Sequence, residues 1–115
     1  MQKFAIAAAI ALAVATMTPA AASASQGPSF SCRHVTVATE RTICKSRNLS
    51  RLDRRLAFWY GLARERARYF DQTRWLRNQQ RAWLRSRNRC GRNRLCLHWK
   101  YRWRIRTLRR YYNHV

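Results

Sequence analysis

The chain predicts an all-α fold: a small, disulfide-bonded, antiparallel bundle of about four helices. Apolar residues recur at spacings of three and four residues through positions 37–112, which is the period of helices that bury one face. No stretch alternates apolar and polar residues for long enough to indicate a strand. The breaks between the periodic stretches are short, and short connections favour antiparallel neighbouring helices.

Residues 1–24 have the features of a secretory signal peptide. Lys3 is followed by an apolar run over residues 4–14 and by a small-residue site at Ala22–Ala24. The run is too short to cross a bilayer comfortably, so a signal peptide is favoured over a retained membrane anchor. We therefore expect a secreted or periplasmic protein, cleaved after Ala24.

The remaining chain predicts one small domain behind a short lead-in. Residues 25–36 contain a glycine, a proline and several serines, and predict an extended segment before a helical domain at 37–112. The first helix is predicted over 37–45. Thr36 is its expected cap, and Glu40 lies in its first turn, where a carboxylate is favourable.

A second, longer helix is predicted from Ser46, as its N-cap, to about Tyr69. Its buried face is expected from residues at helical spacing: Leu49, Leu52, Leu56, Trp59, Tyr60, Ala63, Ala67 and Phe70.

Two further helices are predicted in the second half of the chain. Asp71 is the expected cap of a third helix that ends at about Arg89. Its stripe consists of Leu76, Gln80, Trp83, Leu84 and Arg87. Residues 90–93 interrupt the pattern, and a fourth helix is predicted over 94–112. Its aligned residues are Leu97, Tyr101, Ile105, Leu108 and Tyr112.

Four cysteines in an exported chain favour two disulfides. A metal site is disfavoured because the cysteines do not form compact ligand pairs and the histidines are scattered, at His34, His98 and His114. Sequence permits three pairings. We favour Cys32–Cys44 with Cys90–Cys96, because each pair closes a short loop at a predicted helix junction.

The charge is strongly positive and unevenly distributed. Without Lys3, 24 basic residues face four acids, a net charge of +20, and residues 72–115 hold fourteen basic residues and no acid. Of all 25 basic residues, 22 are arginine, whose guanidinium suits bidentate contact with phosphates and carboxylates. A codon bias could explain arginine over lysine, but it does not explain the missing acids. Such a field attracts polyanions and weakens with salt.

Three sequence blocks together resemble the exported domain family named after the LprI-type lysozyme inhibitor. The blocks run from Cys32 to Leu56, from Gln80 to Cys90, and from Cys96 to Leu108, and so cover nearly the whole predicted mature chain. The resemblance implies a compact, helical, disulfide-bonded domain, periplasmic or secreted, that binds rather than catalyses. It also implies that lysozyme is the binding partner.

The sequence indicates no enzyme and no cofactor. Acid/base catalysis needs two titratable groups held together in a pocket, and the four acids lie far apart along the chain. The three histidines have no evident nucleophile beside them, and the thiols are expected in disulfides.

Asp53 and Arg87 are predicted to form a structural ion pair. Each borders an apolar stripe of its helix, at the edge of the core, where an unpaired charge is costly. Arg104 is the alternative partner of Asp53. A ligand site at Asp53 is the functional alternative. The nearby rings of Trp59, Tyr60, Trp83 and Tyr101 are predicted to be core aromatics.

The fourth helix also carries an outer strip that its core does not need. At about 100° per residue, Trp99 and Trp103 point away from Leu97, on the side opposite the apolar stripe. Arg106 and Arg110 share this side. We define the outer strip as these four residues with the flanking Lys100 and Arg102. Exposed tryptophan is uncommon and requires a reason.

Three interpretations of the outer strip are open. Indoles and guanidiniums suit the headgroup region of an anionic membrane, and they also suit the surface of an anionic envelope polymer. An antimicrobial action would be one consequence of such binding. Nucleic acid is expected to bind only nonspecifically, because the protein is exported. Alternatively, a second subunit or the lead-in covers the strip, with arginine stacked on tryptophan for stability. The sequence leaves the oligomeric state open.

Overall fold

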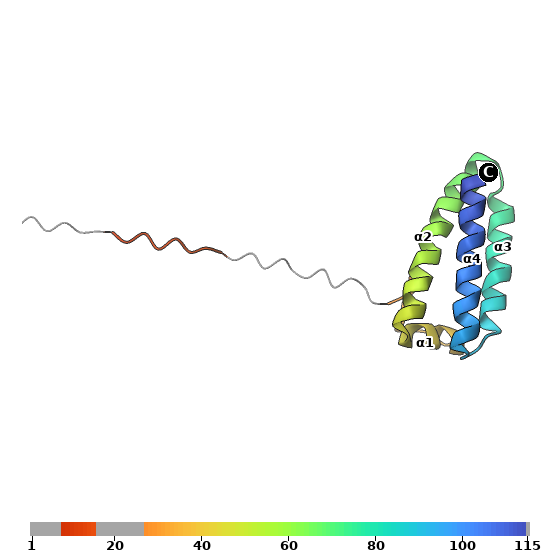
Figure 1. The fold of residues 1–115 in the computed structure, drawn as a ribbon, viewed down its shortest axis with the longest axis horizontal. Helices are drawn as coiled ribbons and strands as arrows, with labels where there is room; N and C mark the ends of the chain where they lie inside the picture. Colours follow the sequence, from red (N-terminus) through yellow and green to blue (C-terminus); the bar gives the residue numbers. More distant parts are fainter. Residues whose placement is uncertain (1–7, 16–26, 115) are drawn as a thin grey trace, which may run out of the picture.

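A computed structural model describes residues 8–15 and 27–114. The chain forms four helices in this part: α1 Ala38–Lys45, α2 Arg47–Tyr69, α3 Thr73–Asn88 and α4 Arg94–His114. Three long helices stand side by side, and the short α1 lies across one end of them (Figure 1). Consecutive long helices run antiparallel, so α2 and α4 run in the same direction. The predicted all-α bundle is confirmed.

The predicted signal peptide falls largely outside the described residues. Residues 8–15 form no helix and are exposed, while residues 1–7 and 16–24 lie outside the description. Among the described residues, no helix is both long enough and apolar enough to cross a bilayer.

Local side-chain chemistry determines where α2 and α4 begin. The Oγ of Ser46 accepts a hydrogen bond from the backbone N–H of Leu49 at 3.2 Å, as predicted for an N-cap. The Oδ1 of Asn93 accepts one from the backbone N–H of Cys96 at 3.0 Å, a cap that the helical spacing alone does not reveal. Both caps satisfy donors that have no partner in the first helical turn.

The predicted caps of α1 and α3 are wrong. The N-cap position of α1 is Val37 rather than Thr36, and the position before α3 is Gln72 rather than Asp71. Asp71 instead has a φ of 56°, the left-handed conformation that commonly ends a helix. It therefore belongs to the end of α2, and aspartate tolerates this conformation better than most residues.

The core lies where the three stripes meet. Leu49, Leu56 and Ala63 of α2 and Leu97 of α4 are buried in one cluster, and α2 packs against α4. The buried apolar residues of the four helices are Ile43, Leu49, Leu52, Leu56, Ala63, Ala67, Leu76, Trp83, Leu97, Tyr101, Ile105 and Leu108. Phe70 is an exception to the prediction, because it is 43% exposed at the end of α2.

Two disulfides join the predicted pairs. Cys32 bonds to Cys44 and Cys90 bonds to Cys96, and the described residues contain no free cysteine. The first ties the lead-in to α1, and the second closes the turn between α3 and α4. Disulfides of this kind are typical of proteins in an oxidising, extracellular-type environment.

Two glycines provide a matched test of the backbone. Gly61 lies within α2 and Gly91 has a φ of 58° between α3 and α4; an added Cβ meets nothing within 4 Å at either position. Gly61→Ala should therefore raise the free energy of unfolding by about 0.5–1 kcal/mol. Gly91→Ala should lower it by about 1 kcal/mol, because alanine is strained in the left-handed region. Urea unfolding followed by circular dichroism measures both, and equal shifts would contradict the assigned turn.

Candidate anion-binding face on α4

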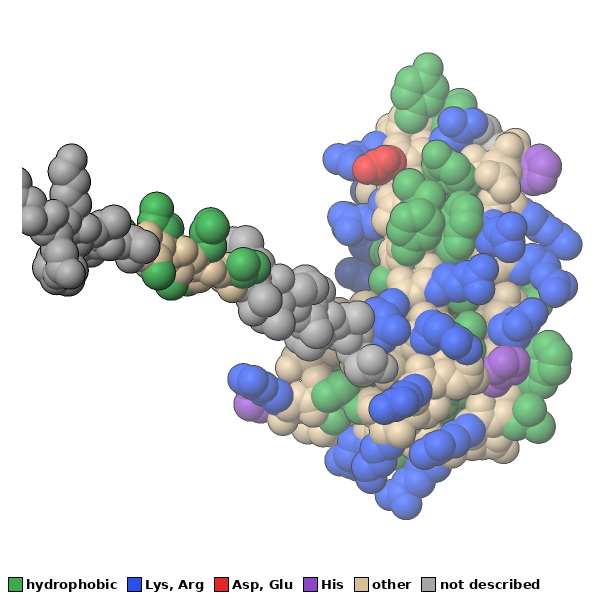
Figure 2. All heavy atoms as spheres, turned by 60° about the vertical axis from the view of Figure 1, so that its left-hand side comes forward, with side chains coloured by type: hydrophobic (Ala, Val, Ile, Leu, Met, Phe, Trp, Pro, Cys, Tyr) green, Lys and Arg blue, Asp and Glu red, His purple; other side chains and the backbone are tan. Residues whose placement is uncertain are grey.

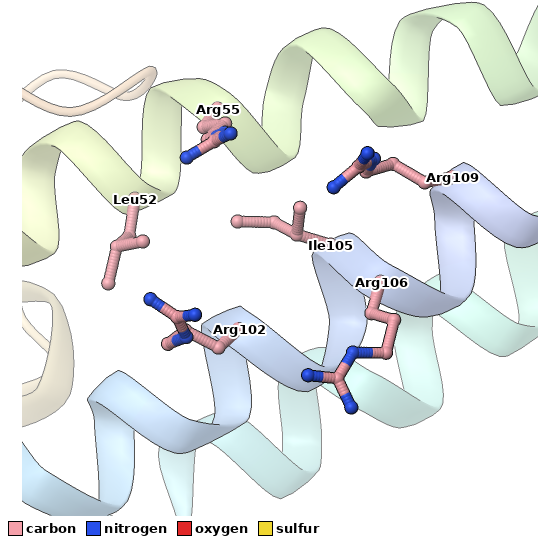
Figure 3. A pocket seen from close by; sticks show the side chains of 6 residues that line it. All are labelled: Leu52, Arg55, Arg102, Ile105, Arg106 and Arg109. Atoms are coloured by element: carbon pink, nitrogen blue, oxygen red, sulfur yellow. The ribbon is translucent and has the colours of Figure 1, made fainter.

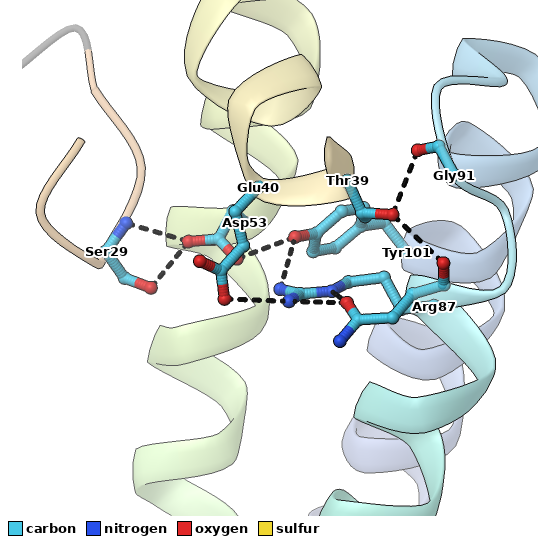
Figure 4. A network of polar contacts seen from close by, with 8 residues as sticks. Ser29, Thr39, Glu40, Asp53, Arg87, Gly91 and Tyr101 are labelled. Atoms are coloured by element: carbon cyan, nitrogen blue, oxygen red, sulfur yellow. Dashed lines mark hydrogen bonds and ion pairs between the residues drawn. The ribbon is translucent and has the colours of Figure 1, made fainter. Parts of the chain in front are cut away.

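A buried carboxylate links the lead-in to α2 and α4. Asp53 is 4% exposed, and its Oδ2 accepts hydrogen bonds from the backbone N–H of Ser29 at 2.7 Å and from the Ser29 hydroxyl. Its Oδ1 accepts a hydrogen bond from the hydroxyl of Tyr101 at 2.7 Å (Figure 4). The two oxygens thus have three donors, which offset the cost of burying the charge.

The predicted direct ion pair of Asp53 with Arg87 is wrong. Arg87 instead forms an ion pair with Glu40 of α1, with 3.6 Å between Nη2 and Oε1. Its Nη1 donates to the Tyr101 hydroxyl at 3.4 Å (Figure 4). Tyr101 therefore stands between the two charged groups, because its ring reaches from α4 into the space that a direct contact would need.

The alternative partner, Arg104, does not meet Asp53 either. Its Nε donates to the Oε1 of Gln80 at 3.0 Å, and both residues are buried. Burial lowers the pKa of Arg104, and a smaller opposing effect comes from Tyr60. The registry of α3 against α4 places Gln80, rather than a carboxylate, opposite Arg104.

Tyr101 is a permanent donor in this network. Burial raises the pKa of its phenol far above the ordinary value, and the negative charge of Asp53 raises it further. The hydroxyl is thus protonated throughout the physiological range. The network Ser29–Asp53–Tyr101–Arg87–Glu40 joins the lead-in and all four helices.

The two tryptophans of the outer strip lie in solvent as predicted. Trp99 is 61% and Trp103 63% exposed. With Ser86, Cys96 and Lys100 they line an open, mainly apolar hollow, which we call the indole groove. Lys100 crosses to α3, where its Nζ donates to the Ser86 hydroxyl at 2.6 Å.

The arginines of the outer strip divide into two groups. Arg102 and Arg106 line a pocket between α4 and α2, together with Arg55, Arg109 and an apolar floor of Leu52 and Ile105 (Figure 3). We call this the arginine pocket. Arg110 is exposed but lines neither the groove nor the pocket.

Sequence reasoning missed Arg55 and Arg109. Both flank predicted core positions, at Leu52 plus three and Leu108 plus one, so their spacing placed them at the edges of the apolar stripes. The position of α2 beside α4 could not be derived from one helix alone. This packing places Arg55 in the same pocket as Arg102.

Positive charge dominates the surface. Lys and Arg side chains extend along the bundle on the face seen in Figure 2. Of the four acids, Asp53 is buried and Glu40 faces Arg87, while Glu65 and Asp71 lie at the far half of α2 and beyond its end. No acid occurs in α4, so neither the groove nor the pocket receives a carboxylate from that helix.

The described part of the lead-in does not cover the tryptophans. Ser29 and Phe30 line a cavity with Asp53, Gln80 and Arg87, at the junction of α2 and α3. The proposed covering of the outer strip by the lead-in is therefore not seen for residues 27–36. Trp83 and Tyr101 are core aromatics as predicted, whereas Trp59 and Tyr60 are partly buried.

Chemical groups for catalysis or metal binding are not gathered on the outer strip. Among residues 8–15 and 27–114, no group of three or more His, Cys, Asp or Glu is arranged to hold a metal ion. His98 lies beside Trp99, with ring centroids 5.3 Å apart, and its Nδ1 is 3.3 Å from the amide of Asn48.

Comparisons of the chain with protein families, with curated proteins and with solved structures found no match.

Replacing the buried carboxylate tests the network. Asp53→Asn keeps the volume but presents an amide donor to one of its donor partners, Ser29 or Tyr101. We expect the free energy of unfolding to fall by about 2 kcal/mol. Glu65→Gln, an exposed change of the same kind on α2, should shift it by less than about 0.5 kcal/mol. Equal effects in urea unfolding would contradict a structural role for Asp53.

The raised pKa of Tyr101 predicts alkaline destabilisation. The unfolded phenol ionises near its ordinary pKa of about 10, whereas the folded phenol does not, so stability is fully present below about pH 10 and falls above it. Tyr101→Phe should be less stable at pH 7 but should lose less stability between pH 9 and about 11. Thermal melting across this range measures the slopes, and parallel slopes would contradict the assignment.

Proposed function

We propose that this chain is an exported, non-catalytic binding protein of the cell envelope that attaches to anionic lipid surfaces through the outer strip of α4. The observation that carries the proposal is the exposure of Trp99 and Trp103 beside Arg102 and Arg106 on a helix without acids. Exposed indoles at this spacing serve no core, and the arginines have no carboxylate on their own helix.

The physical chemistry of a lipid interface suits this face. Tryptophan prefers the boundary between acyl chains and headgroups, where its ring is partly dehydrated and its N–H retains a partner. Guanidiniums at the same level contact lipid phosphates. The indole groove lies on the α3 side of α4 and the arginine pocket on its α2 side, so both border the outer face of this helix.

Export supports a partner in the envelope. Two disulfides agree with an oxidising compartment. The signal peptide predicted at residues 1–24 would deliver the chain to that compartment. In this setting nucleic acid is not a routine partner, although the net charge supports nonspecific binding to it.

Lysozyme inhibition, which the LprI-type resemblance implies, is the less favoured proposal. The residues that carry the resemblance are mostly core residues: Leu49, Leu52, Asp53, Leu56, Gln80, Trp83, Arg87, Leu97, Tyr101, Arg104, Ile105 and Leu108. Because these residues are buried, the resemblance supports a shared fold and gives no support to a shared binding surface. A basic lysozyme would also be repelled by this protein, which has few exposed acids to offer.

Vesicle binding tests the proposal. The full chain should bind vesicles containing anionic phospholipid, bind neutral vesicles weakly, and release with rising salt. Trp99→Ala with Trp103→Ala should weaken binding on the order of tenfold, because two interfacial rings are lost. Every variant carries the same residues 1–26, so any contribution of that segment is common to all measurements.

A matched pair of exposed rings provides the control. Phe58 and Tyr69 of α2 are 61% and 83% exposed and lie outside the indole groove. Phe58→Ala with Tyr69→Ala should leave vesicle binding within about twofold of the unmodified chain. An equal loss in both pairs would contradict a specific role for the outer strip. Absence of vesicle binding, with lysozyme inhibited near equimolar amounts, would favour the lysozyme partner instead.

A further inference from the structure

Four arginine side chains line a single small pocket. Arg55 of α2 and Arg102 and Arg109 of α4 place their guanidiniums around Leu52 and Ile105 (Figure 3). Arg106 also lines the pocket, but its guanidinium extends away from these two side chains. The cavity has a volume of about 130 Å³. Leu52 and Ile105 are buried beneath it, so its floor is apolar while its rim is cationic.

The charges of this rim have no carboxylate beside them among residues 8–15 and 27–114. No carboxylate lines the pocket, and the ion pair that the described residues contain, Arg87 with Glu40, lies elsewhere. Arg109 has a partial alternative contact, since its guanidinium carbon lies 5.4 Å from the centre of the Trp59 ring. Like charges held together repel one another, and a bound anion would relieve that repulsion.

The size of the cavity restricts the anion. A water molecule takes about 30 Å³ of liquid, so the cavity has room for roughly four waters. A tetrahedral oxyanion such as a phosphate group fits this space. A guanidinium presents its donors in a planar fork that matches two phosphate oxygens at once.

We propose that the arginine pocket binds the terminal phosphate group of a phosphomonoester, such as a lipid headgroup that ends in phosphate. This inference rests on the proposed function and narrows it to one headgroup chemistry. A phosphomonoester offers three terminal oxygens and up to two negative charges, whereas a phosphodiester offers two such oxygens and one charge. A rim of several arginines therefore favours the monoester by both charge and number of acceptors.

The place of the pocket on α4 agrees with a headgroup ligand. Arg102 and Arg106 each follow an exposed tryptophan by three residues, which is about one helical turn. A phosphate in the pocket would thus lie beside the indole rings, at the depth where headgroups meet acyl chains. The outer strip supplies general attachment to the surface, and the pocket supplies selection of the headgroup.

Two kinds of vesicle test the inference. One contains phosphatidate, a phosphomonoester lipid, and the other contains phosphatidylglycerol, a phosphodiester lipid, with both adjusted to equal surface potential. The full chain should bind the phosphatidate vesicles more tightly, by about tenfold. Arg55→Gln with Arg109→Gln should abolish this preference while retaining binding to phosphatidylglycerol, because the tryptophans remain.

The control pair removes the same charge outside the pocket. Arg81 and Arg85 are exposed on α3 and do not line the pocket. Arg81→Gln with Arg85→Gln should weaken binding to both vesicles by equal factors and keep the preference. Thermal melting verifies that Arg109→Gln, which also loses its contact with Trp59, leaves the fold intact.

The outcomes separate the inference from the proposed function. Equal binding to both vesicles, or a preference that survives in Arg55→Gln with Arg109→Gln, overturns the phosphomonoester site and leaves surface attachment in place. Titration with inorganic phosphate, at constant ionic strength, distinguishes the source of the phosphate. Shifts of the pocket arginines in nuclear magnetic resonance spectra without any vesicle binding would support the site and overturn the lipid surface as its setting.

Discussion

The buried carboxylate of Asp53 is the interaction on which the arrangement of the chain depends. Its oxygens accept from Ser29 in the lead-in and from Tyr101 in α4, and Tyr101 in turn meets Arg87, which faces α1. A single negative charge thus links the lead-in, α2 and α4 directly and, through Tyr101, also reaches Arg87 of α3. The chain has a net charge of +21 and only four acids, so one quarter of its carboxylates is used to hold the fold together.

Most of the fold could be predicted because local chemistry determines it. The Ser46 cap, the disulfide pairs at helix junctions and the apolar stripes all depend on residues close together in the sequence. The partners of Asp53 could not be predicted in the same way. A helical wheel places Tyr101 in the core, but it does not say which side chain of a neighbouring helix its hydroxyl will meet.

The candidate site could be predicted only in part, for the same reason. The exposure of Trp99 and Trp103 follows from rotation about one helix axis, so the sequence sufficed. The arginine pocket needs the parallel packing of α2 and α4, which brings Arg55 beside three arginines of the other helix. The structure thereby divides α4 into a buried side that builds the bundle and an outer side that the bundle does not require.

The helical continuity of the chain also bears on its resistance to proteases. Trypsin-like proteases cut after arginine in extended backbone, and helical backbone must first open to be cut. Nineteen of the 22 arginines lie within helices; the others are Arg33, Arg89 and Arg92. Arg33 and Arg92 lie inside the loops closed by the two disulfides, so a cut at either leaves the pieces covalently joined. The positions of the arginines, in helices and in loops closed by disulfides, therefore protect the chain from such proteases.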